Sequence, residues 1–386
     1  MSNFLKKILA ATGLTRRGHL VEATATLQRA LADHVAATMP SAPATDPAAM
    51  KTIAPTKPGG PLDDDVLDGL VHEVRSGAAT TVDRPSRFAE SSFTGATGTR
   101  LFKLFEPAGF AGPLPMVVML HGCTQDPDDF ATGTRMNLLA QELGWFVLYP
   151  AQAPRSNANK CWNWFVPDDQ RRGHGEPALI AGMTRHVMET HPVDADRVFV
   201  AGLSAGGAMA AILAREYPDL YAAAGIHSGL AAGSAHDVGS AFAAMKTGVA
   251  RATLPPRWPG RPAVEADATE GANAGAPVIV FHGDADPTVN VVNASLLLDA
   301  ALGASGSWQA TRQSGTSEQG RGYTRTTYRA ENASGAAPSR AEHWLVHGGG
   351  HAWFGGDKRG SYADAAGPDA SREMLRFFAE HGLSRR

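Results

Sequence analysis

The stretch Arg197-Val-Phe-Val-Ala-Gly-Leu-Ser-Ala-Gly-Gly-Ala-Met-Ala210 determines how the rest of this sequence is interpreted. A β-branched, apolar run leads into the pattern G-x-S-x-G and then into small residues that suit a helix. This pattern is typical of the nucleophile elbow, a tight strand-to-helix turn that exposes a serine hydroxyl above a sheet. Gly202 and Gly206 lack a Cβ, so the turn can close with the serine in an unfavourable backbone region. Ser204 is therefore the candidate nucleophile, and its partners must come from elsewhere in the chain.

A serine nucleophile needs a general base and an acid that orients the base. Asp286 follows an apolar strand within Phe281-His-Gly-Asp-Ala-Asp-Pro-Thr-Val289. His351 follows a later strand within His347-Gly-Gly-Gly-His-Ala-Trp-Phe-Gly-Gly356. The chain order serine, aspartate, histidine is that of the α/β-hydrolases. The sequence therefore predicts a catalytic triad of Ser204, Asp286 and His351.

Both strand ends offer a second candidate. Asp284 can be a turn residue that caps its own backbone, and we favour Asp286 because the acid in such folds usually follows the turn. His347 is interpreted as the polar end of its strand, whereas the glycines before His351 form a flexible loop that could bring the imidazole to the serine. The remaining histidines are interpreted as core or loop residues, including His227 and His282.

The tetrahedral intermediate of acyl transfer requires hydrogen-bond donors. One expected donor is the backbone N–H of Ala205, the residue after the nucleophile, and the other comes from the loop His121-Gly-Cys-Thr-Gln125. We assign the second donor to the Cys123 amide. The Cys123 thiol is a weaker candidate nucleophile, because it has no better paired base than Ser204. No histidine or cysteine pattern indicates a metal site, and we expect neither a metal nor a cofactor.

The remaining pattern predicts an α/β fold, with a mostly parallel sheet covered by helices on both faces. Strands are expected at 116–120, 145–149, 198–203, 222–227, 277–281 and 344–347, helices near 136–143, 176–190 and 370–381, and an antiparallel edge pair at 91–95 and 100–106. Residues 229–276 are expected to form an irregular insertion over the carboxyl ends of the strands, residues 304–322 a loop, and residues 323–328 an edge strand.

The first 62 residues differ from the rest of the chain. Residues 1–35 carry helix-spaced apolar positions, and residues 36–62 are rich in alanine and proline. We therefore expect 1–62 to be a short helical segment with a linker, and 63–386 to be the catalytic domain. The helical segment could pack on its own domain, form a homodimer, or anchor the protein to a granule or another partner.

The composition excludes several classes of protein. The chain has 386 residues, of which 43% are hydrophobic and 19% charged, with a formal net charge of −3. This charge gives no basic surface for nucleic acid. No run approaches the roughly 18 apolar residues of a membrane span, and the N-terminus lacks the apolar core of a signal peptide, so a cytoplasmic location is expected. The only cysteines, Cys123 and Cys161, could form a bridge in an oxidising compartment or remain buried thiols in the cytosol.

Several motifs along the chain belong together: Leu120-His-Gly-Cys-Thr-Gln125, Cys161-Trp-Asn-Trp-Phe165, Asp194-Ala-Asp-Arg-Val198, Gly202-Leu-Ser-Ala-Gly-Gly207, His282-Gly-Asp-Ala-Asp-Pro-Thr-Val289 and Gly350-His-Ala-Trp353. As a set they resemble the poly(3-hydroxybutyrate) depolymerase family of esterases. The resemblance implies an α/β-hydrolase fold, a Ser-Asp-His triad, ester hydrolysis, and a bridge between Cys123 and Cys161. The family is also similar to feruloyl and acetylxylan esterases, so membership alone does not select the substrate.

Trp162 and Trp353 flank the reactive loops and are predicted to line a groove for substrate, because aromatic side chains offer large apolar contacts. Trp164 suits a substrate contact and core packing equally. The predicted function is a serine esterase that acts on short-chain hydroxyalkanoate esters, as small molecules, oligomers or polymer. One alternative is a feruloyl- or acetylxylan-type carbohydrate esterase, and another is a non-catalytic granule- or partner-binding protein on a hydrolase scaffold. The absence of a recognisable signal peptide or separate substrate-binding domain argues against action on extracellular solid polymer.

Overall fold

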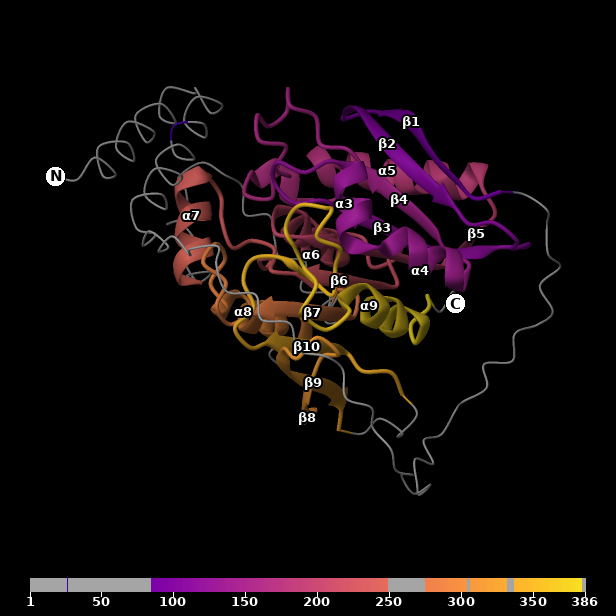
Figure 1. The fold of residues 1–386 in the computed structure, drawn as a ribbon. Coiled ribbons are helices and arrows are strands. Elements are labelled where there is room, and N and C mark those ends of the chain that lie inside the picture. The colour runs from indigo at the N-terminus through magenta and orange to yellow at the C-terminus, as the bar shows by residue number, and fades with distance from the viewer. Residues whose placement is uncertain (1–25, 27–84, 249–274, 304–305, 332–336, 384–386) are drawn as a thin grey trace, which may run out of the picture.

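The computed structural model describes Thr26 and residues 85–248, 275–303, 306–331 and 337–383 (Figure 1). Apart from Thr26, the expected N-terminal segment 1–62 lies outside the described residues, and so do residues 249–274 of the expected insertion. The domain boundary at residue 62 and the homodimer through the N-terminal helices therefore stay predictions. Among the residues that the structure describes, no helix is long and apolar enough to cross a membrane.

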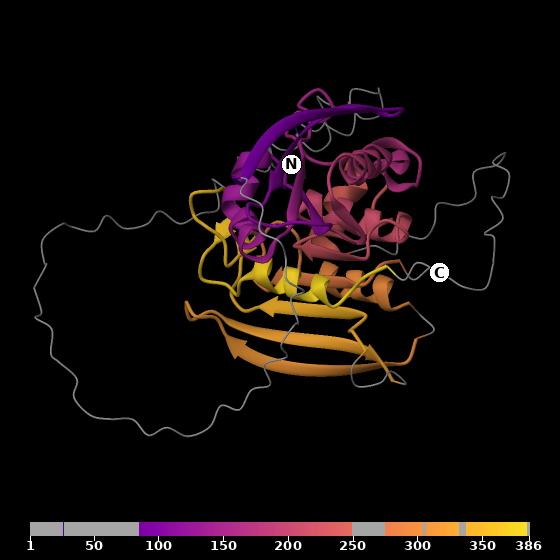
Figure 2. The same ribbon diagram turned by 90° about the vertical axis from the view of Figure 1, so that its right-hand side faces the viewer.

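The fold is organised around a sheet of ten strands in the order β1-β2-β4-β3-β5-β6-β7-β10-β9-β8. The six strands from β4 to β10 in this order run parallel, and the pairs at both ends are antiparallel. Figure 2 shows these two antiparallel pairs at opposite ends of the molecule. The strands are β1 (Arg87–Gly95), β2 (Gly98–Glu106), β3 (Leu114–Leu120), β4 (Phe146–Pro150), β5 (Val193–Leu203), β6 (Ala223–His227), β7 (Val278–Gly283), β8 (Trp308–Thr316), β9 (Gly322–Ala330) and β10 (Ala341–Val346).

Helices cover both faces of the sheet. The helices are α3 (Pro127–Thr134), α4 (Met136–Leu143), α5 (Gly175–Thr190), α6 (Ala205–Glu216), α7 (Val238–Thr247), α8 (Val292–Leu302) and α9 (Ala370–Ala379), with a short 3-10 helix η1 (Pro167–Gln170). Helices α5, α6 and α8 contribute to one apolar core, and α3, α4 and α9 contribute to the other. In β3, Val118 belongs to the first core, whereas its neighbours Val117 and Met119 belong to the second. Alternate residues of a strand point to opposite faces, so a strand covered on both sides needs a continuous apolar run.

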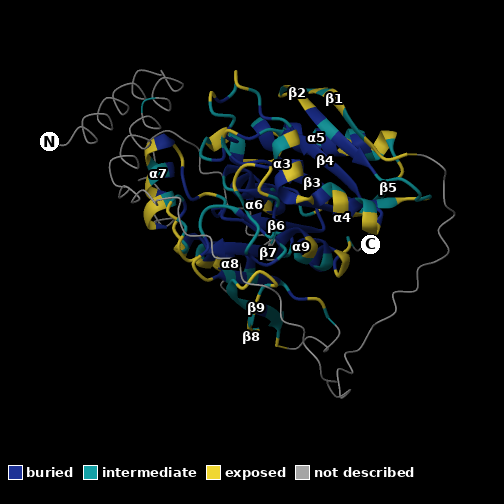
Figure 3. Cartoon of the chain, in the orientation of Figure 1, coloured by how far each residue is buried: buried dark blue, intermediate teal, exposed yellow. Residues whose placement is uncertain are grey.

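This architecture confirms the expected α/β fold, and the apolar strands were the elements best predicted. Figure 3 shows the central strands buried and the β8–β9 end more exposed. The prediction was wrong at that end, because β8 lies within the expected loop 304–322. Strand β9 is therefore an internal strand rather than the expected edge strand. The side chains of β8 are mostly exposed and polar, so this strand is held by its backbone pairing with β9. Its sequence lacks the alternation of apolar and polar residues that predicts a strand.

The expected irregular insertion 229–276 contains a regular helix. Helix α7 begins at a capping box in which the Asp237 side chain accepts a hydrogen bond from the Ser240 amide, and the Ser240 hydroxyl closes the box. Such reciprocal bonds satisfy amides that a helix start leaves without partners. Helices α3 and α8 were not predicted either. Asp126 caps α3 and Pro127 occupies its first turn, which is a recognisable helix-start signal.

Candidate active site

Ser204 occupies the turn between β5 and α6, at the point that the nucleophile-elbow pattern predicts. Its backbone has φ 58° and ψ −118°, a region that side-chain-bearing residues rarely adopt and that is often found at functional sites. A Cβ on Gly206 would lie 2.0 Å from the Leu120 carbonyl oxygen, and one on Gly202 would lie 2.4 Å from the Gly206 backbone. Only glycine fits at these two positions. The Ser204 amide donates a 2.9 Å hydrogen bond to the His227 carbonyl, which fixes the turn against β6.

Asp286 and His351 form a hydrogen-bonded pair. His351 Nδ1 lies 2.7 Å from Asp286 Oδ2, and the side chains are 10% and 0% exposed. The other carboxylate oxygen accepts the Thr288 and Val289 amides at 2.8 and 2.9 Å. Burial opposes ionisation of this carboxyl, but His351 and the two amides outweigh it and lower the pKa of Asp286. The structure therefore holds an oriented imidazole against a fixed carboxylate.

The expected triad residues all follow parallel strands. Ser204 follows β5, Asp286 lies in the loop after β7, and His351 lies in the loop after β10. Carboxyl ends of parallel strands meet at one edge of a sheet, where ligand sites of open α/β folds lie. The three residues of the predicted triad are therefore brought to the same edge by the topology.

The rival candidates Asp284 and His347 form a second pair close by. His347 Nδ1 lies 3.1 Å from Asp284 Oδ2, and the side chains are 46% and 39% exposed. The Gly348 amide donates to Asp284 Oδ1 at 2.7 Å, and Thr324 bonds the other ring nitrogen of His347. These bonds link the loops after β7 and β10 to β9. Because both ring nitrogens of His347 have partners, the pair offers no free imidazole nitrogen.

His227 and His282 are buried, as expected of core residues, but both support the loops of the site. His282 Nε2 donates to the Val289 carbonyl at 2.9 Å and lies 3.6 Å from Asp286 Oδ2. His227 Nε2 accepts the Phe354 amide at 3.1 Å, and its ring stacks on Trp353. Burial lowers the pKa of both histidines, so they are neutral rings near neutral pH. Their positions at the ends of β6 and β7 were the only sequence signal for this role.

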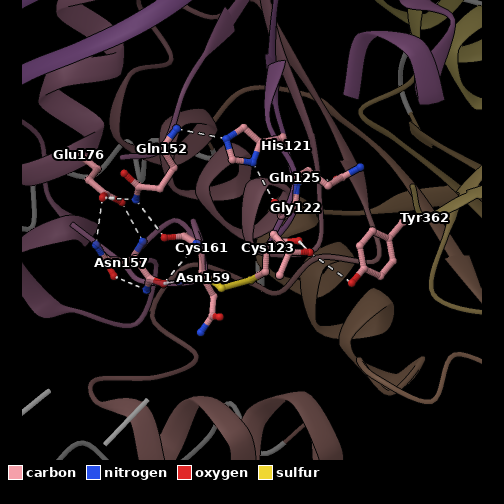
Figure 4. Close-up of a disulfide and its surroundings, with 12 residues drawn as sticks. His121, Gly122, Cys123, Gln125, Gln152, Asn157, Asn159, Cys161, Glu176 and Tyr362 are labelled. Carbon is pink, nitrogen blue, oxygen red and sulfur yellow. Dashed lines mark hydrogen bonds between the residues drawn. A yellow bond between two sulfur atoms is a disulfide. The ribbon is translucent and has the colours of Figure 1, made fainter. Parts of the chain in front are cut away.

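The loop after β3 carries the expected oxyanion donor and is held by a disulfide. Cys123 and Cys161 are bridged, with their Cα atoms 4.2 Å apart (Figure 4). This confirms the pairing that the family resemblance implied, and it leaves Cys123 without the free thiol that a cysteine nucleophile would need. Within the part of the chain that the structure describes, no acceptor takes the Cys123 amide. Ala205 opens α6, so its amide has no acceptor within the helix.

A buried polar network supports the two loops that the disulfide joins. His121 Nε2 accepts the Gln152 amide at 3.1 Å, and Nδ1 donates to the Gly122 carbonyl at 2.8 Å. Burial lowers the pKa of His121 to about 4, so the ring is neutral and can make both bonds. The Gln152 side chain also donates to the Cys161 carbonyl at 2.9 Å and to Glu176. Figure 4 shows His121, Gln152 and Glu176 on one side of the bridge, with dashed lines for the bonds that join Gln152 to His121 and to Glu176.

Trp162 and Trp353, which were predicted to line a substrate groove, are buried instead, and so is Trp164, for which core packing was one of two equal alternatives. Trp162 is 0%, Trp353 1% and Trp164 6% exposed. Trp353 packs edge-on against Phe130 and donates its indole N–H to Ser371 at 3.0 Å. The prediction of a tryptophan-lined surface is therefore corrected, because these large apolar side chains fill the core.

Tyr362 is an exposed aromatic side chain near the loop after β3, and it was not singled out from the sequence. It is 46% exposed, and its backbone φ is 51°, which is rare for an aromatic residue. Its hydroxyl lies 3.3 Å from Thr124 Oγ1, next to Cys123 (Figure 4). Its carbonyl accepts the Trp353 amide at 2.7 Å. Only its place in the segment after His351 could have indicated a role.

The comparisons with known proteins agree with this geometry. Residues 101–322 match the family described as esterase PHB depolymerase. Poly(3-hydroxyalkanoate) depolymerase C of Paucimonas lemoignei is 36% identical over 193 residues, covering 48% of this chain and 44% of that protein. Feruloyl esterase B of Thermothelomyces thermophilus is 35% identical over 128 residues, covering 33% and 43%. Acetylxylan esterase A of Talaromyces purpureogenus is 29% identical over 201 residues, covering 50% of each.

This chain thus spans half or less of the length of these curated relatives. Among solved structures, an acetyl xylan esterase from Aspergillus awamori has a TM-score of 0.54 at 18% identity and covers 76% of this chain and 99% of that chain. That likeness concerns the α/β-hydrolase fold. The sequence match covers more than half of the chain and includes the serine elbow and the disulfide loop. The chain therefore belongs to the esterase PHB depolymerase family.

Proposed function

We propose that this protein is a serine esterase that hydrolyses carboxylic esters through an acyl-enzyme. The observation that carries the proposal is the buried Asp286–His351 pair, at the same sheet edge as the strained Ser204 turn. The free ring nitrogen of His351 takes the proton from the Ser204 hydroxyl as the serine attacks the ester carbonyl. Asp286 holds the imidazole in the required tautomer and stabilises the imidazolium that forms.

The developing oxyanion is held by the amides of Ala205 and Cys123 in this proposal. Among the described residues neither amide has an acceptor, and such preorganised donors stabilise the tetrahedral intermediate. Protonated His351 then gives its proton to the leaving alcohol. A water molecule, activated by the same histidine, attacks the acyl-enzyme and restores the serine hydroxyl. No step requires a metal or a cofactor.

The proposed substrates are short-chain hydroxyalkanoate esters, as small molecules, oligomers or polymer. The support is the similarity to a poly(3-hydroxyalkanoate) depolymerase over 48% of this chain. The similarity to feruloyl and acetylxylan esterases supports carbohydrate esters as a second substrate class. Initial rates on hydroxybutyrate oligomers, p-nitrophenyl esters, feruloyl esters and acetylated xylan would separate the two classes. Preference for the last two would replace our substrate assignment.

The first prediction concerns the nucleophile. Replacing Ser204 with alanine should abolish hydrolysis of p-nitrophenyl butyrate and labelling by an organophosphonate, because the attacking hydroxyl is lost. Circular dichroism should show the fold retained. If the wild-type protein is folded but neither hydrolyses esters nor is labelled, the non-catalytic scaffold alternative is favoured instead.

The second prediction concerns Tyr362, which we propose contacts the substrate in place of the buried tryptophans. Tyr362→Ala should raise KM several-fold and change kcat little, because ground-state and transition-state binding are lost together. Tyr362→Phe keeps the ring and removes the hydroxyl, so it distinguishes the contributions of these two groups to substrate binding. Leu138, which is 62% exposed on α4, offers a surface control in Leu138→Ala. An unchanged KM in Tyr362→Ala would remove this residue from the substrate site.

The cytoplasmic location stays a prediction, and the disulfide is evidence against it. Bridges such as Cys123–Cys161 persist in oxidising compartments and are rare in the cytosol. A thiol count on unreduced protein isolated from each cell fraction would test the location. Two free thiols per chain in the cytoplasmic fraction would support the sequence-based expectation.

A further inference from the structure

The loop after β3, which carries Cys123, is held by hydrogen bonds of the Gln125 side chain as well as by the disulfide. Gln125 is 2% exposed, and its Oε1 accepts the Gly122 amide at 2.9 Å. A Cβ on Gly122 would lie 3.1 Å from that oxygen, so the side chain of Gln125 sits directly against the backbone before Cys123. The bond uses the Gly122 amide, whereas the Cys123 amide has no acceptor among the residues that the structure describes.

The other end of the Gln125 side chain is also held. Its Nε2 donates to Asp129 Oδ2 at 2.9 Å and to the Ser361 carbonyl at 3.1 Å. Asp129 in turn accepts the Ser361 amide at 2.8 Å and the Ser361 hydroxyl at 2.5 Å. These three side chains, which we call the Gln125 clamp, therefore join the loop after β3, helix α3 and a segment more than 230 residues later in the chain.

That distant segment belongs to the loop that carries His351. Ser361 precedes Tyr362, whose carbonyl accepts the Trp353 amide at 2.7 Å, two residues after His351. The segment also lies close against α3, because a Cβ on Gly360 would lie 2.4 Å from the Gly133 backbone. The Gln125 clamp thus connects the proposed oxyanion donor to the proposed general base through a short chain of bonds.

The loop needs such a restraint. Thr124 has φ 68°, a left-handed conformation that is costly for a threonine and persists only where the surroundings impose it. The disulfide fixes Cys123 through its side chain, but rotation about side-chain bonds leaves the direction of the amide adjustable. The Gly122 N–H that the Gln125 side chain holds belongs to the peptide unit before the one that carries the Cys123 N–H, and the carbonyl of this second unit accepts His121 Nδ1 at 2.8 Å and the Gln125 amide at 3.4 Å. Because each peptide unit is planar, these bonds together orient the Cys123 N–H. An oxyanion donor must point at the developing charge within a few tenths of an ångström to be effective.

We propose that Gln125, held by Asp129 and Ser361, is a positioning residue that aims the Cys123 amide at the oxyanion and aligns it with His351. The inference rests on the proposed esterase function and adds a residue with no direct contact to substrate. A residue of this kind acts on kcat, because the amide that it aims interacts with the transition state more strongly than with the ester.

The test compares Gln125→Ala with Gln141→Ala. Gln141 is a matched control, since its partly buried side chain on α4 bonds the Ala108 amide and carbonyl at 2.8 and 3.1 Å. For p-nitrophenyl butyrate, Gln125→Ala should lower kcat about 10- to 100-fold with KM within about threefold, somewhat less than the loss of an oxyanion donor. Its rate constant for labelling by an organophosphonate should fall in parallel. Gln141→Ala should leave both rates within about twofold.

A rescue experiment separates positioning from general destabilisation. Gln125→Glu keeps the acceptor for the Gly122 amide but places a carboxylate against Asp129, so kcat should fall. Adding Asp129→Asn restores a donor and an acceptor between the two side chains, and kcat should recover at least severalfold. Thermal melting of each variant gives the stability change. Recovery of the melting temperature without recovery of kcat would overturn the proposal.

These measurements distinguish a failure of the proposed Gln125 role from a failure of the proposed esterase function. If the wild-type protein is labelled at Ser204 and Gln125→Ala is labelled equally fast, the Gln125 clamp is overturned and the esterase function stands. If folded wild-type protein is not labelled, the esterase function is overturned, and the clamp inference falls with it.

Discussion

Two aspartate–histidine pairs lie within a few residues of each other, and they differ mainly in burial. Asp286 and His351 are 0% and 10% exposed and 2.7 Å apart, whereas Asp284 and His347 are 39% and 46% exposed and 3.1 Å apart. Both pairs connect the loop after β7 to the loop after β10. The buried carboxylate is fixed by two amides and orients one imidazole. The exposed pair is open to solvent and is bonded to Thr324 in β9.

This difference shows why residue type and separation alone do not select a catalytic pair. An exposed ion pair contributes at most about 1 kcal/mol, because water competes with each contact. In a buried pair the hydrogen bond has no solvent competitor, so the orientation of the ring is enforced. We therefore expect the two pairs to respond very differently to the same substitution.

The largest expected effect is on catalysis. Asp286→Asn should lower kcat for p-nitrophenyl butyrate on the order of 10³- to 10⁴-fold, because an amide can present a donor to His351 and favour the wrong tautomer. Asp284→Asn, the matched control, should change kcat by less than about threefold. The reverse order of effects would assign the catalytic role to the exposed pair.

A smaller difference is expected in folding stability. Asp286→Ala should lower the free energy of unfolding by about 3 kcal/mol, because the Thr288 and Val289 amides and His351 lose their acceptor in a buried site. Asp284→Ala should cost less than about 1 kcal/mol. Urea unfolding at pH 7 measures both values. Equal losses would show that burial does not distinguish the pairs.

The smallest expected effect is on the acid dependence of stability. The pKa of Asp286 is lowered from its ordinary value of 3.8 in the folded protein. The folded state thus binds fewer protons here than the unfolded state, so stability falls as the pH drops below about that value. Asp286→Asn removes this group, and its unfolding free energy should fall less steeply between pH 5 and pH 2. An equally steep fall would place the acid-sensitive carboxylates elsewhere.

The agreement between sequence and structure follows the strength of the physical signal. Buried parallel strands such as β3 and β5 were predicted because both faces are apolar. Strand β8 was missed because its exposed polar residues carry no such pattern. The elbow at Ser204 was recognisable because close backbone packing excludes every residue but glycine at Gly202 and Gly206. Trp162 and Trp353 were misassigned because aromatic residues near a motif suit the core as well as a groove.

The sequence by itself determined the α/β class, the serine elbow and the candidates for acid and base, since each depends on local pattern and chain order. The tertiary structure decided which partners meet. It separated the buried Asp286–His351 pair from the exposed Asp284–His347 pair, bridged Cys123 to Cys161, and brought Ser361 to Gln125. The physical reason is that contacts between residues far apart in the chain depend on how strands and helices pack, and no local pattern records that packing.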